Sequence, residues 1–338
     1  MSVLVVGGAG YIGSHFAKCL AQRGHVPVVL DNLCSGRADA VKYGPLVVGD
    51  AGDVPMLRET FLAHRVDAVV HFASHIQVGE SVTDPAKYYA NNVAETLRLL
   101  DAMREAGITR FVFSSTAAVY GLPQSTPMAE THPQQPINPY GRSKLVIEQI
   151  LDDYARAYGL RYASLRYFNA AGADPDGELG ECHDPETHLI PLVLQAASGR
   201  REAVTVYGDD YATRDGTCER DYVHVTDLAE AHRAALDYLA GGGECGAFNL
   251  GTGTGCTVSE VIRAAERVTT KRIAVKQAAR REGDPDRLLA DPRKAQSAFG
   301  WKARLSDLDT LLRHAWRWER TLCGERAFAT PTNGLVTP

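Results

Sequence analysis

No stretch of this 338-residue sequence is apolar over the ~20 residues that a membrane-spanning helix needs. The apolar run Val3–Val6 is too short for the core of a signal peptide and leads straight into a glycine-rich turn. The net charge of -5 leaves no basic footprint of the kind that binds nucleic acid. We therefore expect a cytoplasmic protein with no membrane and no nucleic-acid partner.

Cysteine is scarce as well: there are seven residues, scattered along the chain, with no C-x-x-C pair. An odd number of isolated cysteines is typical of reduced thiols in a cytoplasm and argues against a disulfide framework. Cys182-His183, with His188 nearby, brings together side chains that bind metals, but the spacing does not match the usual zinc patterns. We expect no metal site.

The chain is long enough for a large domain and a smaller one. Hydrophobic residues make up 45% and charged residues 23%, which is ordinary for a folded protein. We expect a first domain over residues 1–170 and a smaller one mainly over 171–322, with some segments able to return to the first. Residues 323–338 are expected to form a loose tail.

The N-terminal residues have the order of a dinucleotide-binding unit. Val3–Val6 is a continuous apolar run, typical of a strand buried on both faces. It ends in a G-x-x-G-x-x-G turn, followed by a helix over 11–23 and a second strand over 26–30. Asp31 stands at the tip of that strand, eighteen residues after Gly13. Glycines and a helix N-terminus accept a pyrophosphate, while a carboxylate at this tip favours NAD over NADP.

Further apolar segments alternate with helical patterns along the first half of the chain. Strands are predicted over 46–49, 67–71 and 110–114, and helices over 53–64 and 84–106. Repeated β-α-β order predicts an α/β fold with a Rossmann-type, doubly wound parallel sheet. Asp50 follows a strand end and is a candidate contact at the adenine side, although a simple loop-start acid is an equal alternative.

The segment Asn138-Pro139-Tyr140 reads as a helix start, with Asn138 as N-cap and Pro139 in the first turn. Tyr140 and Lys144 would then lie on one helix face, because positions i and i+4 are neighbours. Lowering the pKa of a tyrosine from ~10 to ~7 takes about 4 kcal/mol. A cation held nearby supplies roughly 1–3 units of that shift. Alone, such a pair is more often part of a solvated helix face than of a catalytic site.

The second half contains two arginine-bearing loops, at Arg220 and at Arg280-Arg281. Arginine forks match phosphate oxygens, so Arg220 and Arg281 favour binding of a diphosphate. Surface salt links are the alternative. Asn169 is predicted just past a strand end and could bond the same diphosphate or form a local Asx turn.

Taken together, these motifs resemble the extended short-chain dehydrogenase/reductase family and, within it, the UDP-sugar 4-epimerases. The motifs that carry the resemblance are Gly7-x-x-Gly10-x-x-Gly13, Asn91-Asn92-Val93, Ser114-Ser115-Thr116, Tyr140-x-x-x-Lys144, Arg166-Tyr167-Phe168-Asn169 and Arg280-Arg281-Glu282-Gly283-Asp284. The resemblance implies an NAD-dependent isomerase that interconverts UDP-galactose and UDP-glucose through a transient 4-keto sugar. It implies Tyr140 as base, Lys144 as its helper and Thr116 as hydrogen-bond partner of the sugar 4-oxygen.

The same resemblance implies the binding residues. Those for NAD are Gly7, Gly10, Tyr11, Ile12, Gly13, Asp31, Asn32, Asp50, Phe72, Ala73, Asn91, Ser114, Tyr140, Lys144 and Tyr167. Those for the UDP-sugar are Thr116, Tyr140, Asn169, His188, Leu189, Arg220, Arg281, Asp284 and Leu288.

The chain departs from the family pattern at three positions. Ile76 replaces a lysine that is usual in the turn after His-Phe-Ala, and His188 stands where better-known members carry asparagine. Leu288 falls at a residue that limits the sugar pocket, where a large aromatic residue goes with unacetylated hexoses and a small residue with N-acetyl sugars. A related UDP-N-acetylhexosamine, UDP-uronic acid or UDP-pentose therefore remains an alternative substrate.

Two further alternatives concern the class of protein. Related 4,6-dehydratases need an acid pair after the active-site Ser/Thr, and this chain has Ala117-Ala118 there, so we expect it to stop at epimerisation. A silent NAD-binding module on the same fold is the non-enzymatic alternative, against which the intact Thr116, Tyr140 and Lys144 argue.

The resemblance also implies a homodimer. The two long helices would pair across a two-fold axis, through apolar positions that could equally serve the internal core: Val93, Leu97, Leu100, Ile147 and Leu151.

Overall fold

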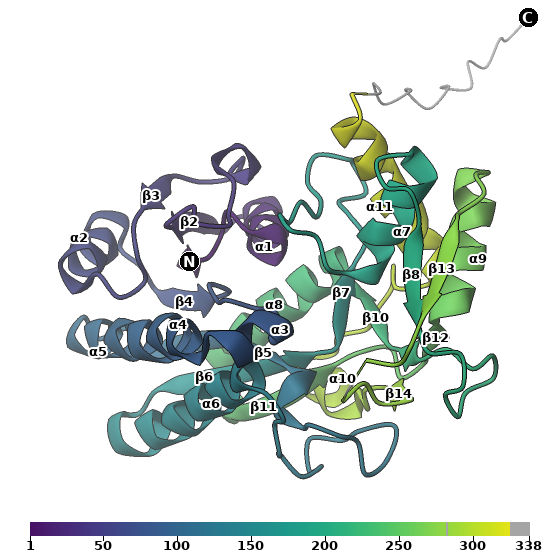
Figure 1. Cartoon of the computed structure of the whole chain (residues 1–338). Coiled ribbons are helices and arrows are strands. Elements are labelled where there is room, and N and C mark those ends of the chain that lie inside the picture. The colour runs from purple at the N-terminus through teal and green to yellow at the C-terminus, as the bar shows by residue number, and fades with distance from the viewer. Residues whose placement is uncertain (282, 325–338) are drawn as a thin grey trace, which may run out of the picture.

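The computed structural model describes residues 1–281 and 283–324 and is built around a seven-stranded parallel sheet (Figure 1). The order across the sheet is β11-β6-β5-β4-β1-β2-β3. The strands are β1 (Ser2–Val6), β2 (Val26–Asp31), β3 (Leu46–Val48), β4 (Ala68–His71), β5 (Arg110–Thr116), β6 (Arg161–Tyr167) and β11 (Gly246–Leu250). The predicted doubly wound sheet is confirmed.

Helices cover both faces of this sheet, which explains the continuous apolar run of β1. Leu4 and Val6 pack in one core with α2 (Val54–His64), α5 (Thr96–Glu105) and α6 (Pro139–Tyr158). Val3 and Val5 pack in the other core with α1 (Tyr11–Gln22), α8 (Val225–Ala240) and α10 (Arg293–Phe299). Every residue of a doubly covered strand faces an apolar environment.

The helical path predicted over 84–106 has a π-helical middle. It runs through α4 (Pro85–Tyr88), the π segment η2 (Tyr89–Glu95) and α5, after a short α3 (Val78–Thr83). A π segment widens the turn and is frequent at functional sites. Here Asn92 within η2 donates from its side-chain amide to the His75 oxygen and to Ser143 Oγ, which joins η2 to α6.

The C-terminal part contains smaller sheets and a helical layer. Parallel pairs are β7 (Asn169–Ala171) with β10 (Tyr222–His224) and β8 (Val204–Tyr207) with β13 (Val275–Ala278). A third sheet holds β12 (Cys256–Thr257), β9 (Glu219–Arg220) and β14 (Arg287–Leu288). The helices are α7 (Leu189–Ser198), α9 (Val258–Thr269) and α11 (Leu308–Leu322), which pack around one core; the short 3-10 turns of the chain are η1 (Ala38–Ala40) and η3 (Ala117–Val119).

The chain crosses between the two parts more than once. After β10, α8 packs on α1 and β11 pairs with β6, so residues 225–250 complete the large sheet. The segment predicted as a tail falls mostly on residues 325–338, outside the described residues. Within the described ranges, we find no helix with the length and apolar character that crossing a membrane requires.

Candidate active site

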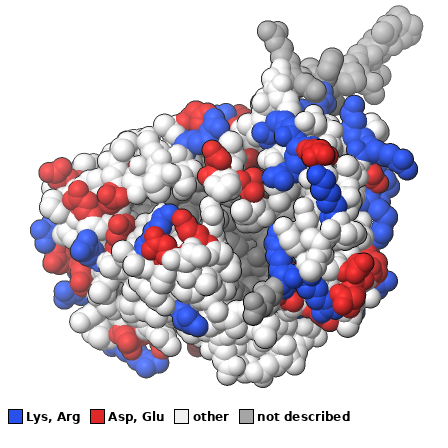
Figure 2. Space-filling model, viewed as in Figure 1, with Lys and Arg blue, Asp and Glu red and all other residues white. Residues whose placement is uncertain are grey.

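The predicted functional residues converge at the carboxyl edge of the large sheet. The glycine turn follows β1, Phe72-Ala73 follows β4, and Thr116 and Tyr167 end β5 and β6. The chain winds outward in opposite directions from β1 and β4, and ligands of doubly wound folds bind at such a switch point. Figure 2 shows this face hollowed between the two parts, with positively charged side chains along its C-terminal side.

The glycine turn is closed too tightly for side chains. A Cβ atom on Gly13 would lie 2.3 Å from the Gly7 oxygen, and one on Gly7 would lie 2.4 Å from the Ala73 nitrogen. Gly10 is the N-cap of α1, and no side chain caps this helix. Tyr11 and Ile12 form its first turn, so their backbone N–H groups and the helix dipole are available to an anion.

Asp31 anchors the turn from the tip of β2. Its carboxylate accepts hydrogen bonds from the backbone nitrogens of Ala9 at 2.9 Å and Leu33 at 2.8 Å. Burial raises the pKa of Asp31, and those two bonds oppose the rise. Beside it, the Asn32 amide donates to Asp50 Oδ1 at 2.7 Å, so three predicted cofactor residues form one polar edge.

The other predicted cofactor residues sit differently. The partly buried Phe72 ring packs against the core, with its centroid 4.7 Å from that of the His232 ring. Asn91 is half-buried and donates to Asn92 Oδ1. Asn92 belongs to the same motif but was not predicted to bind NAD. It is buried, and its side-chain oxygen accepts from the His75 backbone nitrogen, which fixes the turn at His75.

Tyr140, Lys144 and Thr116 come from α6 and the end of β5. The helix begins as predicted, with Asn138 Oδ1 accepting from the Gly141 nitrogen at 2.8 Å. Lys144 is 3% exposed, and its Nζ donates to the Ser114 oxygen at 2.8 Å. Thr116 Oγ1 accepts from the Ala118 nitrogen at 3.1 Å, and its hydroxyl is close enough to Tyr140 to lower the pKa of that phenol.

The electrostatics of this group differ from the simple sequence argument. Burial raises the pKa of Tyr140 to about 12, and the hydrogen bond with Thr116 lowers it only in part. Burial also lowers the pKa of Lys144 to about 7, against the attraction of Glu148, which raises it. The desolvation of both groups outweighs their neighbours, so Tyr140 needs additional positive charge to ionise near neutral pH.

Glu148 is a site residue that sequence reasoning missed. It lies four residues after Lys144 on α6 and pairs with Arg166, whose Nε is 3.0 Å from Glu148 Oε1. Both side chains are under 10% exposed. Glu148 also accepts from Ser115 Oγ at 2.5 Å. The spacing of Tyr140, Lys144 and Glu148 by four residues places them on one helix face, and this pattern in the sequence could have indicated Glu148.

The arginines of the C-terminal part are held by internal partners. Arg220 Nη2 lies 3.1 Å from Asp284 Oδ1, and Arg220 Nη1 donates to the Pro285 oxygen at 2.9 Å. The Arg281 guanidinium stacks 3.9 Å from the ring centroid of Tyr207. The predicted Arg220 and Asp284 are therefore brought together, and Arg281 lies against a residue that sequence reasoning did not select.

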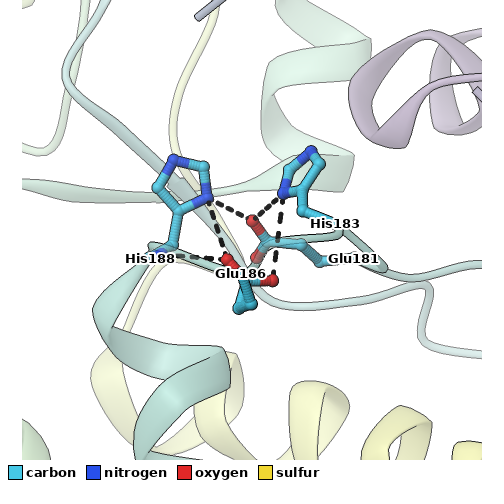
Figure 3. A group of neighbouring side chains, drawn as sticks. All are labelled: Glu181, His183, Glu186 and His188. Atoms are coloured by element: carbon cyan, nitrogen blue, oxygen red, sulfur yellow. Dashed lines mark hydrogen bonds and ion pairs between the residues drawn. The ribbon is translucent and has the colours of Figure 1, made fainter. Parts of the chain in front are cut away.

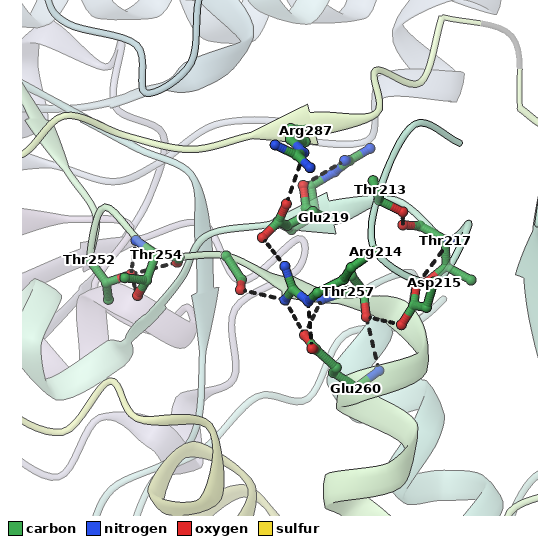
Figure 4. A network of polar contacts seen from close by, with 12 residues as sticks. Thr213, Arg214, Asp215, Thr217, Glu219, Thr252, Thr254, Thr257, Glu260 and Arg287 are labelled. Carbon is green, nitrogen blue, oxygen red and sulfur yellow. Dashed lines mark hydrogen bonds and ion pairs between the residues drawn. The ribbon is translucent and has the colours of Figure 1, made fainter. Parts of the chain in front are cut away.

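A polar network anchors the strand that carries Arg220 (Figure 4). Arg214 bonds Glu260 at the start of α9 through Nε at 2.6 Å and also pairs with Glu219. Arg287 of β14 pairs with the second oxygen of Glu219 at 3.2 Å. Glu219 precedes Arg220 in β9, so this network fixes the backbone from which Arg220 extends.

The remaining substrate candidates lie at the ends of other elements. Asn169 is the first residue of β7, and its amide donates to the Asp221 oxygen at 2.9 Å rather than forming an Asx turn. His188 is the N-cap residue of α7, and Leu189 is its first residue. Leu288 packs against the apolar cluster that contains Ala117, so it lies beside the segment that follows Thr116.

Comparisons with known proteins agree with this geometry. A family model described as GDP-mannose 4,6 dehydratase matches residues 4–314. The UDP-glucose 4-epimerase of Rhizobium meliloti is 55% identical over 94% of this chain and 96% of its own. The UDP-glucose 4-epimerase of Brucella ovis, solved in complex with NAD, superposes with a TM-score of 0.92 at 55% identity, over 93% of this chain and 97% of that one. The UDP-Glc/GlcNAc 4-epimerase of Campylobacter jejuni superposes with a TM-score of 0.83 at 41% identity, over 95% of this chain and 99% of that one.

Proposed function

The chain belongs to the UDP-glucose 4-epimerases of the short-chain dehydrogenase/reductase family, and on that premise we propose that it interconverts UDP-galactose and UDP-glucose with bound NAD. The observation that carries the proposal is the joint placement of Thr116, Tyr140 and Lys144 at the sheet edge that also carries the turn in which Gly7 and Gly13 leave no room for a side chain. Reversible oxidation of an alcohol by NAD requires a general acid–base group next to a dinucleotide-binding turn.

The residues present fit NAD. The contacts at Gly7 and Gly13 leave room for backbone only, and the uncapped start of α1 would hold the pyrophosphate. Asp31 would bond a ribose hydroxyl and repel a 2′-phosphate, which favours NAD over NADP. Asn32 and Asp50 would lie at the adenine side, and Tyr167 and Lys144 toward the nicotinamide ribose. When bound, NAD supplies reversible two-electron oxidation at sugar carbon 4 and, in its oxidised form, a positive charge.

The chain's own residues would move the proton. Tyr140 Oη accepts the proton of the sugar 4-hydroxyl and later returns it to the same oxygen. Thr116 Oγ1, whose hydroxyl lowers the pKa of Tyr140, donates to or accepts from that oxygen. Lys144 lies on the same face of α6 as Tyr140, and the Ser114 backbone oxygen holds its ammonium group in place. This positive charge stabilises the ionised form of Tyr140. Ala117 and Ala118 offer no carboxyl group to eliminate water from carbons 5 and 6.

Arg220, Arg281 and Asn169 would bind the UDP diphosphate. In the present structure Arg220 is paired with Asp284, so a diphosphate oxygen competes with a carboxylate for the same guanidinium. His188 and Leu189, at the start of α7, would contact the substrate. Leu288, intermediate in size, would limit the space beside the sugar, and it favours neither unacetylated nor N-acetyl sugars.

The decisive experiment incubates purified protein, with no NAD added, with UDP-galactose and separately with UDP-N-acetylgalactosamine. We expect conversion of UDP-galactose to UDP-glucose without external cofactor, because NAD is regenerated in each turnover and stays bound. Conversion of neither substrate would refute the proposal. Formation of a 6-deoxy-4-keto product would show a dehydratase instead.

We further propose a homodimer. Of the apolar positions considered for its seam, Leu100, Ile147 and Leu151 are buried in the internal core, whereas Leu97 is 37% exposed. Val82 and Tyr89 are also exposed in this region of α3, η2 and α5. A monomeric mass in light scattering would contradict the dimer.

A cytoplasmic location is supported by the seven free thiols.

A further inference from the structure

Four metal-binding side chains gather on the loop that leads into α7. They are Glu181, His183, Glu186 and His188, and Figure 3 shows them turned toward a common point. One ligand atom from each residue lies within 4.8 Å of every other. The proposed epimerase chemistry uses His188 as a substrate contact and gives the other three no role.

The contacts within this group pair each imidazole with carboxylates. His183 Nδ1 lies 3.1 Å from Glu181 Oε1 and 3.9 Å from Glu186 Oε2. His188 Nδ1 bonds Glu181 Oε1 and lies 3.7 Å from Glu186 Oε1. The side chains of Glu181 and Glu186 are only 4% and 6% exposed. Two carboxylates are thus desolvated around a point that both imidazoles also face, and their charge is compensated there either by protonated imidazoles or by a bound cation.

We propose that Glu181, His183, Glu186 and His188 bind a Zn²⁺ ion. Two imidazole nitrogens and two carboxylate oxygens are ligands that zinc accepts in tetrahedral geometry. Mg²⁺ and Ca²⁺ prefer six or more oxygen ligands, so this donor set does not favour them. The two carboxylates neutralise the charge of one dication.

The loop holds these ligands from outside the cluster. The Trp318 indole nitrogen donates to the backbone oxygen of Glu181 at 2.8 Å. A Cβ atom on Gly180 would lie 2.2 Å from Trp318 Cγ. Glu186 Oε1 accepts from the backbone nitrogen of Thr187 at 2.8 Å. Such outer contacts fix ligand orientation and favour metal affinity.

Neighbouring groups delimit the site. The Tyr11 ring meets His183 edge-on with centroids 6.2 Å apart. Cys182 is turned away, because its Sγ accepts from Arg37 Nη1 at 3.1 Å, so the thiol is not among the four ligands. Four protein ligands make this a structural site, which would fix the loop between the first turn of α1 and the start of α7.

Zinc at this point is compatible with a substrate contact by His188. The cluster uses Nδ1, and Figure 3 shows the second ring nitrogen on the far side from the carboxylates. The side chain is 45% exposed, so that nitrogen remains accessible. The proposal departs from the expectation of no metal, which rested on Cys182-His183 and overlooked the E-x-H-x-x-E-x-H spacing.

The test uses untagged full-length protein, stripped of metal with a chelator. Co²⁺ is added first, because a tetrahedral site gives intense visible absorption that a six-coordinate ion lacks. Zn²⁺ is then titrated against a chromophoric chelator. We expect one Co²⁺ per chain with a tetrahedral spectrum, displaced by one Zn²⁺. No substrate is present, so the outcome is independent of epimerase activity.

The variants His183→Ala and Glu186→Gln should each weaken Zn²⁺ binding at least ~10-fold, since the loss of even an outer-shell partner has that effect. His64→Ala, at a half-buried position of α2, is the matched control and should bind as the wild type does. Circular dichroism checks that each variant folds, and His183→Gln replaces His183→Ala if it does not. Absence of stoichiometric binding, or unchanged affinity in both cluster variants, would overturn the proposal.

Discussion

The Nζ atom of Lys144 donates a hydrogen bond to the backbone oxygen of Ser114 across 2.8 Å. This bond joins α6 to the end of β5 and holds the ammonium in a buried place, where desolvation lowers its pKa to about 7. The i, i+4 spacing placed Lys144 on the face of Tyr140, but β5 determines where on that face its charge stands. The position of one cation is therefore set by two elements that are distant in sequence.

Tyr140→Phe removes the proposed base. The variant lacks the phenol that is proposed to accept the sugar proton, and we expect kcat to fall roughly 10²–10⁴-fold. Bound NAD, measured after denaturation, should be retained. Tyr158→Phe, at the exposed end of the same helix, is the control and should keep wild-type turnover. Full activity in Tyr140→Phe would remove the base assignment.

Glu148→Gln should act through Lys144 as a loss of positioning and charge. Glu148 raises the pKa of Lys144, so its neutralisation lowers that pKa, and the unpaired Arg166 lowers it further. We expect the alkaline limb of the kcat/KM profile to move to lower pH. Stability should fall by about 3–5 kcal/mol because a buried cation loses its partner. Glu148→Asp keeps the charge and should restore most of the limb. Reduced stability with an unmoved pH profile would limit Glu148 to a structural role.

Gly13→Ala should disable the cofactor turn. The new methyl group would approach the Gly7 oxygen to 2.3 Å, and neither atom belongs to a flexible side chain, so the turn must open. We expect purified variant protein to carry little NAD, assayed after denaturation. Gly79→Ala, where the added Cβ meets nothing within 4 Å, is the control. Equal NAD content in the two variants would contradict the assignment of the turn.

Leu288→Tyr tests the limit on sugar size. Leu288 packs beside Ala117, next to the proposed reacting hydroxyl, so a larger side chain reduces the space available to an N-acetyl group. We expect the ratio of kcat/KM for UDP-N-acetylgalactosamine to that for UDP-galactose to fall at least ~10-fold, in line with the steric discrimination of a hydrophobic pocket. Leu122→Tyr, at an exposed position, serves as control. An unchanged ratio would place the sugar elsewhere.

His232→Leu should make the protein less sensitive to acid. Burial lowers the pKa of His232 to about 4, and its Nε2 is buried without a partner among the described residues. The unfolded chain therefore binds a proton between pH ~6.5 and ~4 that the folded chain refuses. The stability due to neutral His232 is fully present above ~6.5 and is lost as pH falls toward ~4, by about 3 kcal/mol in total.

Urea unfolding of wild type and His232→Leu at two pH values measures this effect. The difference in free energy of unfolding should favour the variant more at pH ~4.5 than at pH ~7.5. The same difference at both pH values would show that His232 does not resist protonation in the folded state.

Local patterns predicted much of this protein. The predicted cofactor-binding edge followed from the apolar run of β1, the glycine turn and Asp31. The start of α6 was predicted to the residue from Asn138 and Pro139. Each of these depends on contacts within one or two elements. The π-helical middle of the 84–106 path was not predicted, because the side-chain bonds of Asn92 that accompany it reach Ser143, 51 residues away.

The sequence by itself determined which groups are predicted to carry the chemistry: Thr116, Tyr140 and Lys144, with glycines where a backbone is expected to approach a phosphate. It did so because helix and strand periodicity act over a few residues. The tertiary structure decided the electrical environment of those groups. Burial and the Glu148–Arg166 pair arise where separate elements exclude water together. The cluster around Glu181 is local in sequence, but Tyr11 and Trp318, which contact it, come from distant helices.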